Sequence, residues 1–131
     1  MTVVLDASAA VGLILGRTDH SGIRDAVDSA EEVHVPQLYV AELSNSFWKY
    51  HRLEGLDIDI CQKAVDRGLL LPDRFWDDRE LQREALAMAC ACGTPVYDMF
   101  YLVLARRLGA HLATADRQLR KFAGRHDVRV L

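Results

Sequence analysis

The sequence predicts an α/β protein, a three-layer α/β/α sandwich built around a short, mostly parallel central sheet. Short apolar stretches typical of strands alternate with longer stretches of helical periodicity, the pattern of a parallel sheet covered on both faces. No repeat, linker or low-complexity tract divides the chain. A chain of 131 residues can bury roughly 65–70% of its unfolded surface as one unit. We therefore expect a single domain over residues 1–131.

The first part of the chain contains cues for two strands and three helices. The run Val3-Val4-Leu5 is wholly apolar, which is typical of a central strand in a parallel sheet. Ile23 and Val27 lie four residues apart, as on one side of a helix. Pro36 marks a helix start, because proline is favoured in the first turn. We expect strands at residues 1–5 and 33–35, and helices at 7–15, 21–29 and 36–53.

The second part continues the alternation. Acids from Asp77 onward suit the positive end of a helix dipole, and Gly93 ends that helix. Thr94 and Pro95 together predict the cap and first turn of the next helix. Three leucines at residues 69–71 suit a third strand or, equally, a helix end. The other expected helices are at 58–66, 77–92, 95–108 and 117–123, with strands at 111–114 and 128–131.

The composition limits the class of protein. Half of the residues are hydrophobic and 27% are charged, the balance of an ordered globular domain. The net charge of −3 is not that of a protein that wraps nucleic acid, although an acidic chain can still carry one basic surface. No stretch reaches the roughly 18–20 apolar residues of a membrane span, and no secretory signal is visible. These features predict a cytoplasmic protein that does not contact a membrane.

Cysteine and histidine usage argues against two kinds of site. Cys61, Cys90 and Cys92 are odd in number and form no disulfide framework, so we expect three buried, reduced thiols. The five histidines include no helical pair at metal-ligand spacing. This pattern argues against a zinc site.

Four acids stand where packing does not explain them. Asp6 and Asp116 each follow an apolar strand, so both are expected at the carboxyl edge of the sheet, where open parallel sheets bind ligands. Asp98 lies in the first turn of a helix, and Glu42 lies on the polar side of another. If the fold brings them together, the resulting cluster of carboxylates is tolerable mainly when it holds a divalent cation. Metal-assisted phosphodiester chemistry is the function that this pattern favours.

Each acid alone also has a plain structural explanation. Asp6 and Asp116 can cap the helices that follow them, Asp98 can complement a helix dipole, and Glu42 can be an exposed helix residue. It is their joint occurrence at compatible positions that favours a site. Glu42 is followed at helical spacing by Asn45, Ser46 and Lys49, which places all of them on one polar stripe. Further candidates for contact with backbone phosphates are Lys49, Arg17 and Arg117.

Other α/β families that place an acid after the first strand fit less well. A haloacid-dehalogenase-like phosphatase needs a second acid two residues after Asp6, where this chain has Ser8. A phosphorelay receiver needs an early acidic pair and a late lysine, and neither is found. A dinucleotide-binding fold needs a glycine-rich turn, and residues 6–10 contain no glycine.

Several segments together resemble a known family. The stretches Val3-Val4-Leu5-Asp6-Ala7-Ser8-Ala9, residues 36–45, Tyr97-Asp98 and Thr114-Ala115-Asp116 resemble the PIN-domain ribonucleases, in particular the VapC-type toxins of toxin–antitoxin pairs. The resemblance spans residues 2–120. One departure is Met99, where the family usually has a small residue; it is expected to face the core.

The resemblance implies a function and a site. The matching acids, Asp6, Glu42, Asp98 and Asp116, would bind Mg²⁺ or Mn²⁺ and cut RNA, with Ser8 and Thr114 as polar groups close behind them. We expect Asp6 and Asp98 as core ligands and Asp116 as a ligand directly or through water. The residues leave open whether Glu42 is a ligand or a base.

The resemblance also implies partners, namely an RNA substrate, a second copy in a homodimer and a cognate antitoxin. The non-enzymatic alternative is a catalytically inert PIN-like module that binds protein or RNA.

Overall fold

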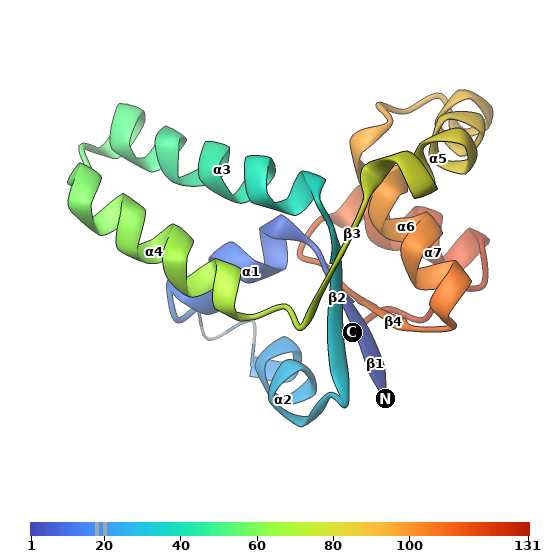
Figure 1. Ribbon diagram of the computed structural model, residues 1–131, viewed down its shortest axis with the longest axis horizontal. Helices are drawn as coiled ribbons and strands as arrows, with labels where there is room; N and C mark the ends of the chain where they lie inside the picture. The colour runs from blue at the N-terminus through green and yellow to red at the C-terminus, as the bar shows by residue number, and fades with distance from the viewer. Residues whose placement is uncertain (18, 20) are drawn as a thin grey trace.

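The computed structural model describes residues 1–17, 19 and 21–131. Its central sheet has four strands in the order β3-β2-β1-β4, and every neighbouring pair runs parallel. Figure 1 shows this sheet nearly edge-on, with helices on both sides. The predicted three-layer α/β/α sandwich is therefore confirmed. The strands are β1 (Thr2–Leu5), β2 (Glu32–Pro36), β3 (Arg74–Trp76) and β4 (His111–Ala113).

The helices form two layers. One layer contains α1, α2 and the long hairpin of α3 and α4, and the other contains α5, α6 and α7 (Figure 1). In the described part of the chain, no single helix is both long and apolar enough to cross a bilayer. Only α5 and α6 taken together, as a pair bent by 116°, have that length and composition. The helices are α1 (Ala7–Ile14), α2 (Ser21–Ser29), α3 (Leu38–Glu54), α4 (Ile58–Leu70), α5 (Asp78–Cys92), α6 (Tyr97–Leu108) and α7 (Arg117–Arg125).

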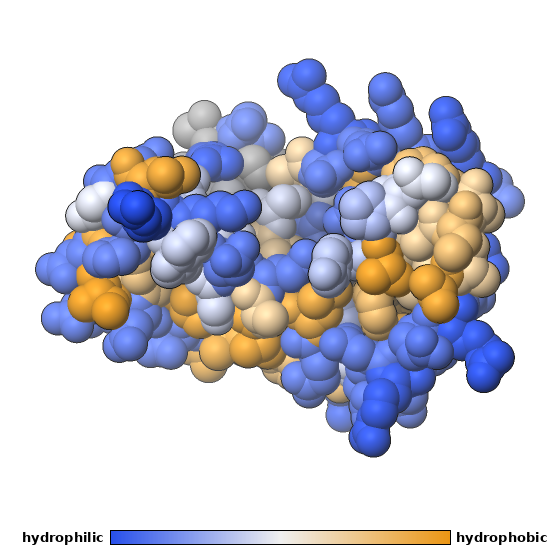
Figure 2. All heavy atoms as spheres, turned by 90° about the horizontal axis from the view of Figure 1, so that it is seen from above, coloured by the Kyte–Doolittle hydropathy of each residue, from blue (hydrophilic) through white to orange (hydrophobic). Residues whose placement is uncertain are grey.

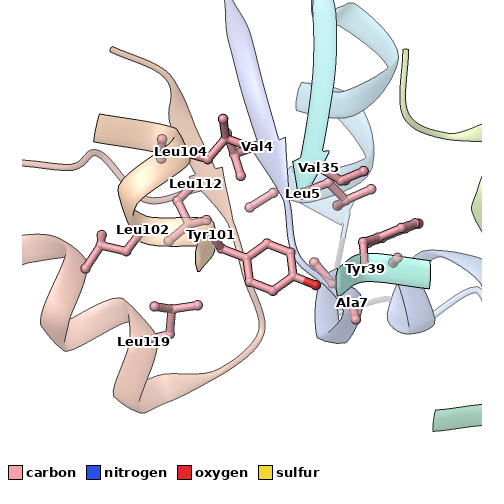
Figure 3. Packing of buried hydrophobic residues seen from close by; sticks show 14 of the residues in the cluster. Val4, Leu5, Ala7, Val35, Tyr39, Tyr101, Leu102, Leu104, Leu112 and Leu119 are labelled. Atoms are coloured by element: carbon pink, nitrogen blue, oxygen red, sulfur yellow. The ribbon is translucent and has the colours of Figure 1, made fainter. Parts of the chain in front are cut away.

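The core lies around β1 and α6. Val3, Val4 and Leu5 have no exposed surface, because both faces of the sheet are covered at β1. This explains why β1 is a continuous apolar run rather than an alternating one. Met99 of α6 is also fully buried, as its position predicted. Figure 3 shows the Tyr101 ring projecting from α6 past the end of β1 towards Ala7.

Two expected strands differ from the structure, although for the first of them a helix end was expected equally. The leucines at residues 69–71 end α4 instead of forming a strand, because they continue its helical pattern up to Pro72. The third strand is β3, which pairs with β2 through Arg74, Phe75 and Trp76. The fifth strand at residues 128–131 is reduced to a single bridge between Val130 and Leu112.

Glycine residues mark the ends of two helices. Gly55 and Gly93 end α3 and α5 in the left-handed conformation, with φ of +69° and +65°, as expected of glycine caps. The helix α6 begins at Tyr97, without the predicted Thr94 cap. Cys90 corrects another expectation. It is exposed on α5 and Cys92 is half-buried, while Cys61 alone of the three is buried.

The first turn of α3 is capped by a residue far away in the sequence. Pro36 closes β2, and α3 begins at Leu38 without a side-chain cap of its own. Instead, the Leu38 N–H donates to Oδ1 of Asp78, at the start of α5, over 3.1 Å. This bond ties the first turn of α3, which precedes Glu42, to the opposite helical layer.

We expect Asp78→Ala to lower the free energy of unfolding by about 1 kcal/mol, because the α3 cap is lost. Urea unfolding at neutral pH measures this change. Glu80→Ala is the matched control, since Glu80 is also an acid in the first turn of α5. If the two variants lose the same stability, the bond to Leu38 contributes nothing beyond the helix dipole.

Candidate active site

A cavity of about 330 Å³ lies at the carboxyl edge of the sheet, where β1 and β4 end beside α3 and α6. The four acids singled out in the sequence come from four separate parts of the chain and all line it. We call it the carboxylate cavity. Figure 2 views the molecule from above and shows hydrophilic residues next to hydrophobic ones on that face. The lining residues are Asp6, Ala7, Ser8, Glu42, Asn45, Ser46, Lys49, Asp98, Tyr101 and Asp116.

Asp6 forms the floor of this cavity. It follows β1 directly and caps α1, because its Oδ1 accepts the Ala9 N–H at 2.8 Å. The Ser8 hydroxyl donates to the same oxygen at 2.7 Å, and the Thr114 hydroxyl donates to Oδ2. Burial raises the pKa of Asp6 to about 6, although these three hydrogen bonds act in the opposite direction. The charge of the nearby Asp98 also contributes to this rise in pKa.

Thr114 and Ser8 hold the ends of β1 and β4 together. Thr114 is fully buried, and its hydroxyl oxygen also accepts the Asp116 N–H at 3.0 Å. The Ser8 hydroxyl accepts the Ala115 N–H at 3.1 Å. These contacts fix the position of Asp6 relative to the loop that carries Asp116. Thr114 therefore acts on the cavity through the acids, whereas Ser8 both positions Asp6 and lines the cavity itself.

Glu42 faces the cavity from α3 and is half-buried. Its Oε1 accepts the Tyr101 hydroxyl at 2.6 Å. Burial raises the pKa of Glu42, the Tyr101 bond lowers it, and Asp98 and Asp78 raise it again. The pKa of the Tyr101 hydroxyl is raised by burial and by Glu42, so Tyr101 stays a neutral donor. The sequence reasoning missed Tyr101, although its position three residues after Asp98 on one helix places both on the same side.

Asp98 and Asp116 complete the set. Asp98 lies in the first turn of α6, and its pKa is raised by burial and by Asp116. Asp116 caps α7, because its Oδ1 accepts the Leu119 N–H at 2.9 Å. The plain explanation of Asp6 and Asp116 as helix caps is thus true as well, whereas Glu42 is not simply an exposed helix residue. Capping holds Asp6 and Asp116 in place at the edge of the cavity.

The other predicted residues divide into two groups. Asn45 and Lys49 line the carboxylate cavity together with Ser46. Arg17 lines an adjoining cavity, and Arg117 lies in a third, beside Arg120. The structure therefore does not bring Arg117 to the lining of the carboxylate cavity.

The donor set suits a hard divalent cation. Among the described residues, none of the four acids forms an ion pair with lysine or arginine. Within the same residues, no group of three Asp, Glu, His or Cys side chains is arranged so that it could hold a metal ion. Mg²⁺ is typically held by one or two carboxylates and several waters, so direct convergence of three acids is not required. The four carboxylates around this cavity could supply one or two such ligands to a cation.

Tyr101→Phe tests the bond that holds Glu42. We expect a loss of roughly 1–2 kcal/mol in the free energy of unfolding, because a partly buried carboxylate loses its donor. Tyr97→Phe on the same helix is the control, since Tyr97 is 57% exposed and should change stability by less than about 0.5 kcal/mol. Urea unfolding of both variants near pH 7.5 measures the difference. Equal stabilities would show that water replaces the Tyr101 hydroxyl without cost.

Comparison with known proteins assigns the chain to a family. Residues 3–125 match the PIN domain. The chain is also 31% identical over 121 residues to Ribonuclease VapC3 of Pyrobaculum aerophilum, covering 91% of this chain and 92% of that protein. The protein therefore belongs to the PIN-domain family.

Solved structures agree on the fold. The crystal structure of PAE2754 from Pyrobaculum aerophilum has a TM-score of 0.76 at 24% identity and covers 99% of this chain and 83% of that one. VapBC2 from Rickettsia felis, bound to a DNA fragment from their promoter, has a TM-score of 0.69 at 14% identity. That match covers 100% of this chain and 98% of the other.

Proposed function

We propose that this protein is an endoribonuclease that depends on Mg²⁺ or Mn²⁺ and serves as the toxin of a type II toxin–antitoxin pair. The observation that carries the proposal is the meeting of four acids at one cavity without a basic ion-pair partner among the described residues. Membership of the PIN-domain family and the relative named Ribonuclease VapC3 support RNA as the substrate. An RNA substrate in turn favours a cytoplasmic location.

Each acid has a role in this proposal. Asp6 and Asp98 would hold the cation, with Asp116 holding it directly or through water. A divalent cation in this position supplies charge neutralisation at the phosphate and lowers the pKa of a water molecule. Ser8 and Thr114 keep Asp6 oriented through their hydrogen bonds.

Glu42 fits two roles, ligand or base. Tyr101 fixes its Oε1. Its raised pKa suits a group that accepts a proton from the attacking water, since a base works best when its pKa lies nearer the working pH. Lys49, on the same stripe of α3, provides a positive charge for the RNA backbone.

The proposed partners follow from the family resemblance. VapC-type toxins pair with an antitoxin, and a cognate antitoxin and a homodimer are therefore proposed here. A small reading frame overlapping just upstream would support the antitoxin.

The activity can be tested without knowing the target. A brief pulse of expression followed by sequencing of RNA ends should reveal new ends at defined positions. The purified protein should cut the same RNA with Mn²⁺ or Mg²⁺ and stop when EDTA is added. RNA that is bound but never cut, at any cation concentration, would instead identify an inert binding module.

A further inference from the structure

A second cavity, of about 520 Å³, adjoins the carboxylate cavity. The two share Ser8, Ser46, Lys49 and Asp116, so they form one continuous surface. The size lies within the roughly 300–1,000 Å³ of typical small-ligand sites. We call it the Arg17–Tyr50 cavity after two of its lining residues. The others are Val11, Leu53, Glu54 and Ala115.

This cavity combines an aromatic ring with a positive charge. Nη2 of Arg17 donates to the Tyr50 hydroxyl at 2.6 Å. The Tyr50 ring packs on Phe47, with ring centroids 5.9 Å apart, and Phe47 is buried. The contact with buried Phe47 therefore fixes the Tyr50 ring against the hydrophobic core. Val11 and Leu53 add apolar surface around it.

The positive charges here have no acidic partners in the described chain. Neither Arg17 nor Lys49 forms an ion pair with any residue that the structure describes. Two cations of this kind beside an acidic cavity, on a chain with net charge −3, are complementary to a phosphate backbone. Glu54 is the one acid of the lining outside the carboxylate cavity, and its oxygens suit the N–H or O–H groups of a base or ribose.

We propose that the Arg17–Tyr50 cavity binds the nucleotide next to the scissile phosphate. Its base would stack on Tyr50, and its phosphate would lie between Arg17 and Lys49. Single-stranded RNA is commonly recognised in this way, by unstacked bases on aromatic side chains and by basic side chains along the backbone. The inference rests on the proposed ribonuclease function and deepens it, because it locates where the neighbouring base is read.

Binding without cleavage tests the proposal. The full chain is titrated in EDTA against a fluorescein-labelled single-stranded RNA of about 12 nucleotides, at several salt concentrations. Arg17→Gln should weaken binding and reduce the slope of log K against log salt by about 0.7, the value for one phosphate contact on a single strand. Tyr50→Ala should weaken binding roughly 5- to 100-fold and leave the slope unchanged, because stacking carries no charge.

Two controls separate the cavity from general effects. Arg52→Gln removes an exposed positive charge from α3, the helix that carries Lys49 and Tyr50, but outside the cavity. It should have a smaller effect on the slope than Arg17→Gln. Tyr50→Phe keeps the stacking ring and its packing on Phe47, so it should retain most of the affinity. Arg17 is exposed, so its variants remain informative even if Tyr50→Ala proves unstable.

The outcomes distinguish this inference from the proposed function. If Arg17→Gln and Tyr50→Ala bind and cleave RNA like the wild type, the proposed subsite is wrong and the proposed ribonuclease function is upheld. The cavity would then be a candidate binding site for a protein partner. If binding depends on both residues and no RNA is ever cut, the subsite stands and the ribonuclease fails. A wild-type protein that does not bind the RNA at all overturns the subsite.

Discussion

Asp98→Asn is expected to reduce Mn²⁺-dependent RNA cleavage by at least about 100-fold, more than the 10- to 100-fold typical of residues that only support a ligand. Asparagine keeps the shape of Asp98 but removes the charge proposed to hold the cation. Cleavage of a defined RNA under single-turnover conditions measures the effect. Cleavage at a rate near that of the wild type would remove Asp98 from the site.

The same variant should remain folded. Asp98 raises the pKa of both Asp6 and Glu42, so its charge repels them in the metal-free protein. Without metal, Asp98→Asn should therefore be as stable as the wild type or more so. Mn²⁺ should raise the melting temperature of the wild type and leave that of the variant unchanged, because a ligand stabilises only the state that binds it.

Asp59→Asn is the matched control for Asp98→Asn. Asp59 also lies in the first turn of a helix, α4, but is exposed and away from the carboxylate cavity. Both variants lose the same interaction with a helix dipole. A loss of cleavage in Asp98→Asn alone is then due to the cavity.

The sequence predicted the parts of the fold that depend on local chemistry. The apolar run Val3-Val4-Leu5 identifies a strand covered on both faces, and Gly55 and Gly93 end their helices as expected. Some capping partners could not be predicted, because they come from elements far away in the sequence. Asp78 capping Leu38 across 40 positions has no counterpart in the local sequence.

The candidate site shows the same division. Asp6 and Asp116 could be placed at one edge of the sheet because parallel strands end together there. The bond from Tyr101 to Glu42 joins α6 to α3, and only the packing of those helices brings the two side chains within 2.6 Å. A tyrosine in a largely apolar helix is ordinarily a core residue, so its spacing of three residues from Asp98 was a weak signal.

The stability of the metal-free protein should increase as the pH falls from about 7.5 to 5. Asp6 has a pKa of about 6 in the folded protein, above its ordinary value of 3.8. Between these values it is protonated only in the fold, so folding binds a proton and is favoured by acid. At about 1.4 kcal/mol for each pKa unit, the full effect is roughly 3 kcal/mol, of which roughly half develops by pH 5. The raised pKa values of Glu42 and Asp98 act in the same direction.

Mn²⁺ should reverse this dependence, because a cation binds ionised carboxylates and competes with protons. With Mn²⁺ present, the free energy of unfolding should then fall as the pH falls. Asp6→Asn should flatten both profiles, since asparagine does not titrate and still accepts the Ala9 N–H through its Oδ1. Chemical unfolding at a series of pH values, with EDTA or with Mn²⁺, gives the two curves. Parallel curves for the wild type would mean that protons and the cation do not compete for the same carboxylates, and the carboxylate cavity would not be the metal site.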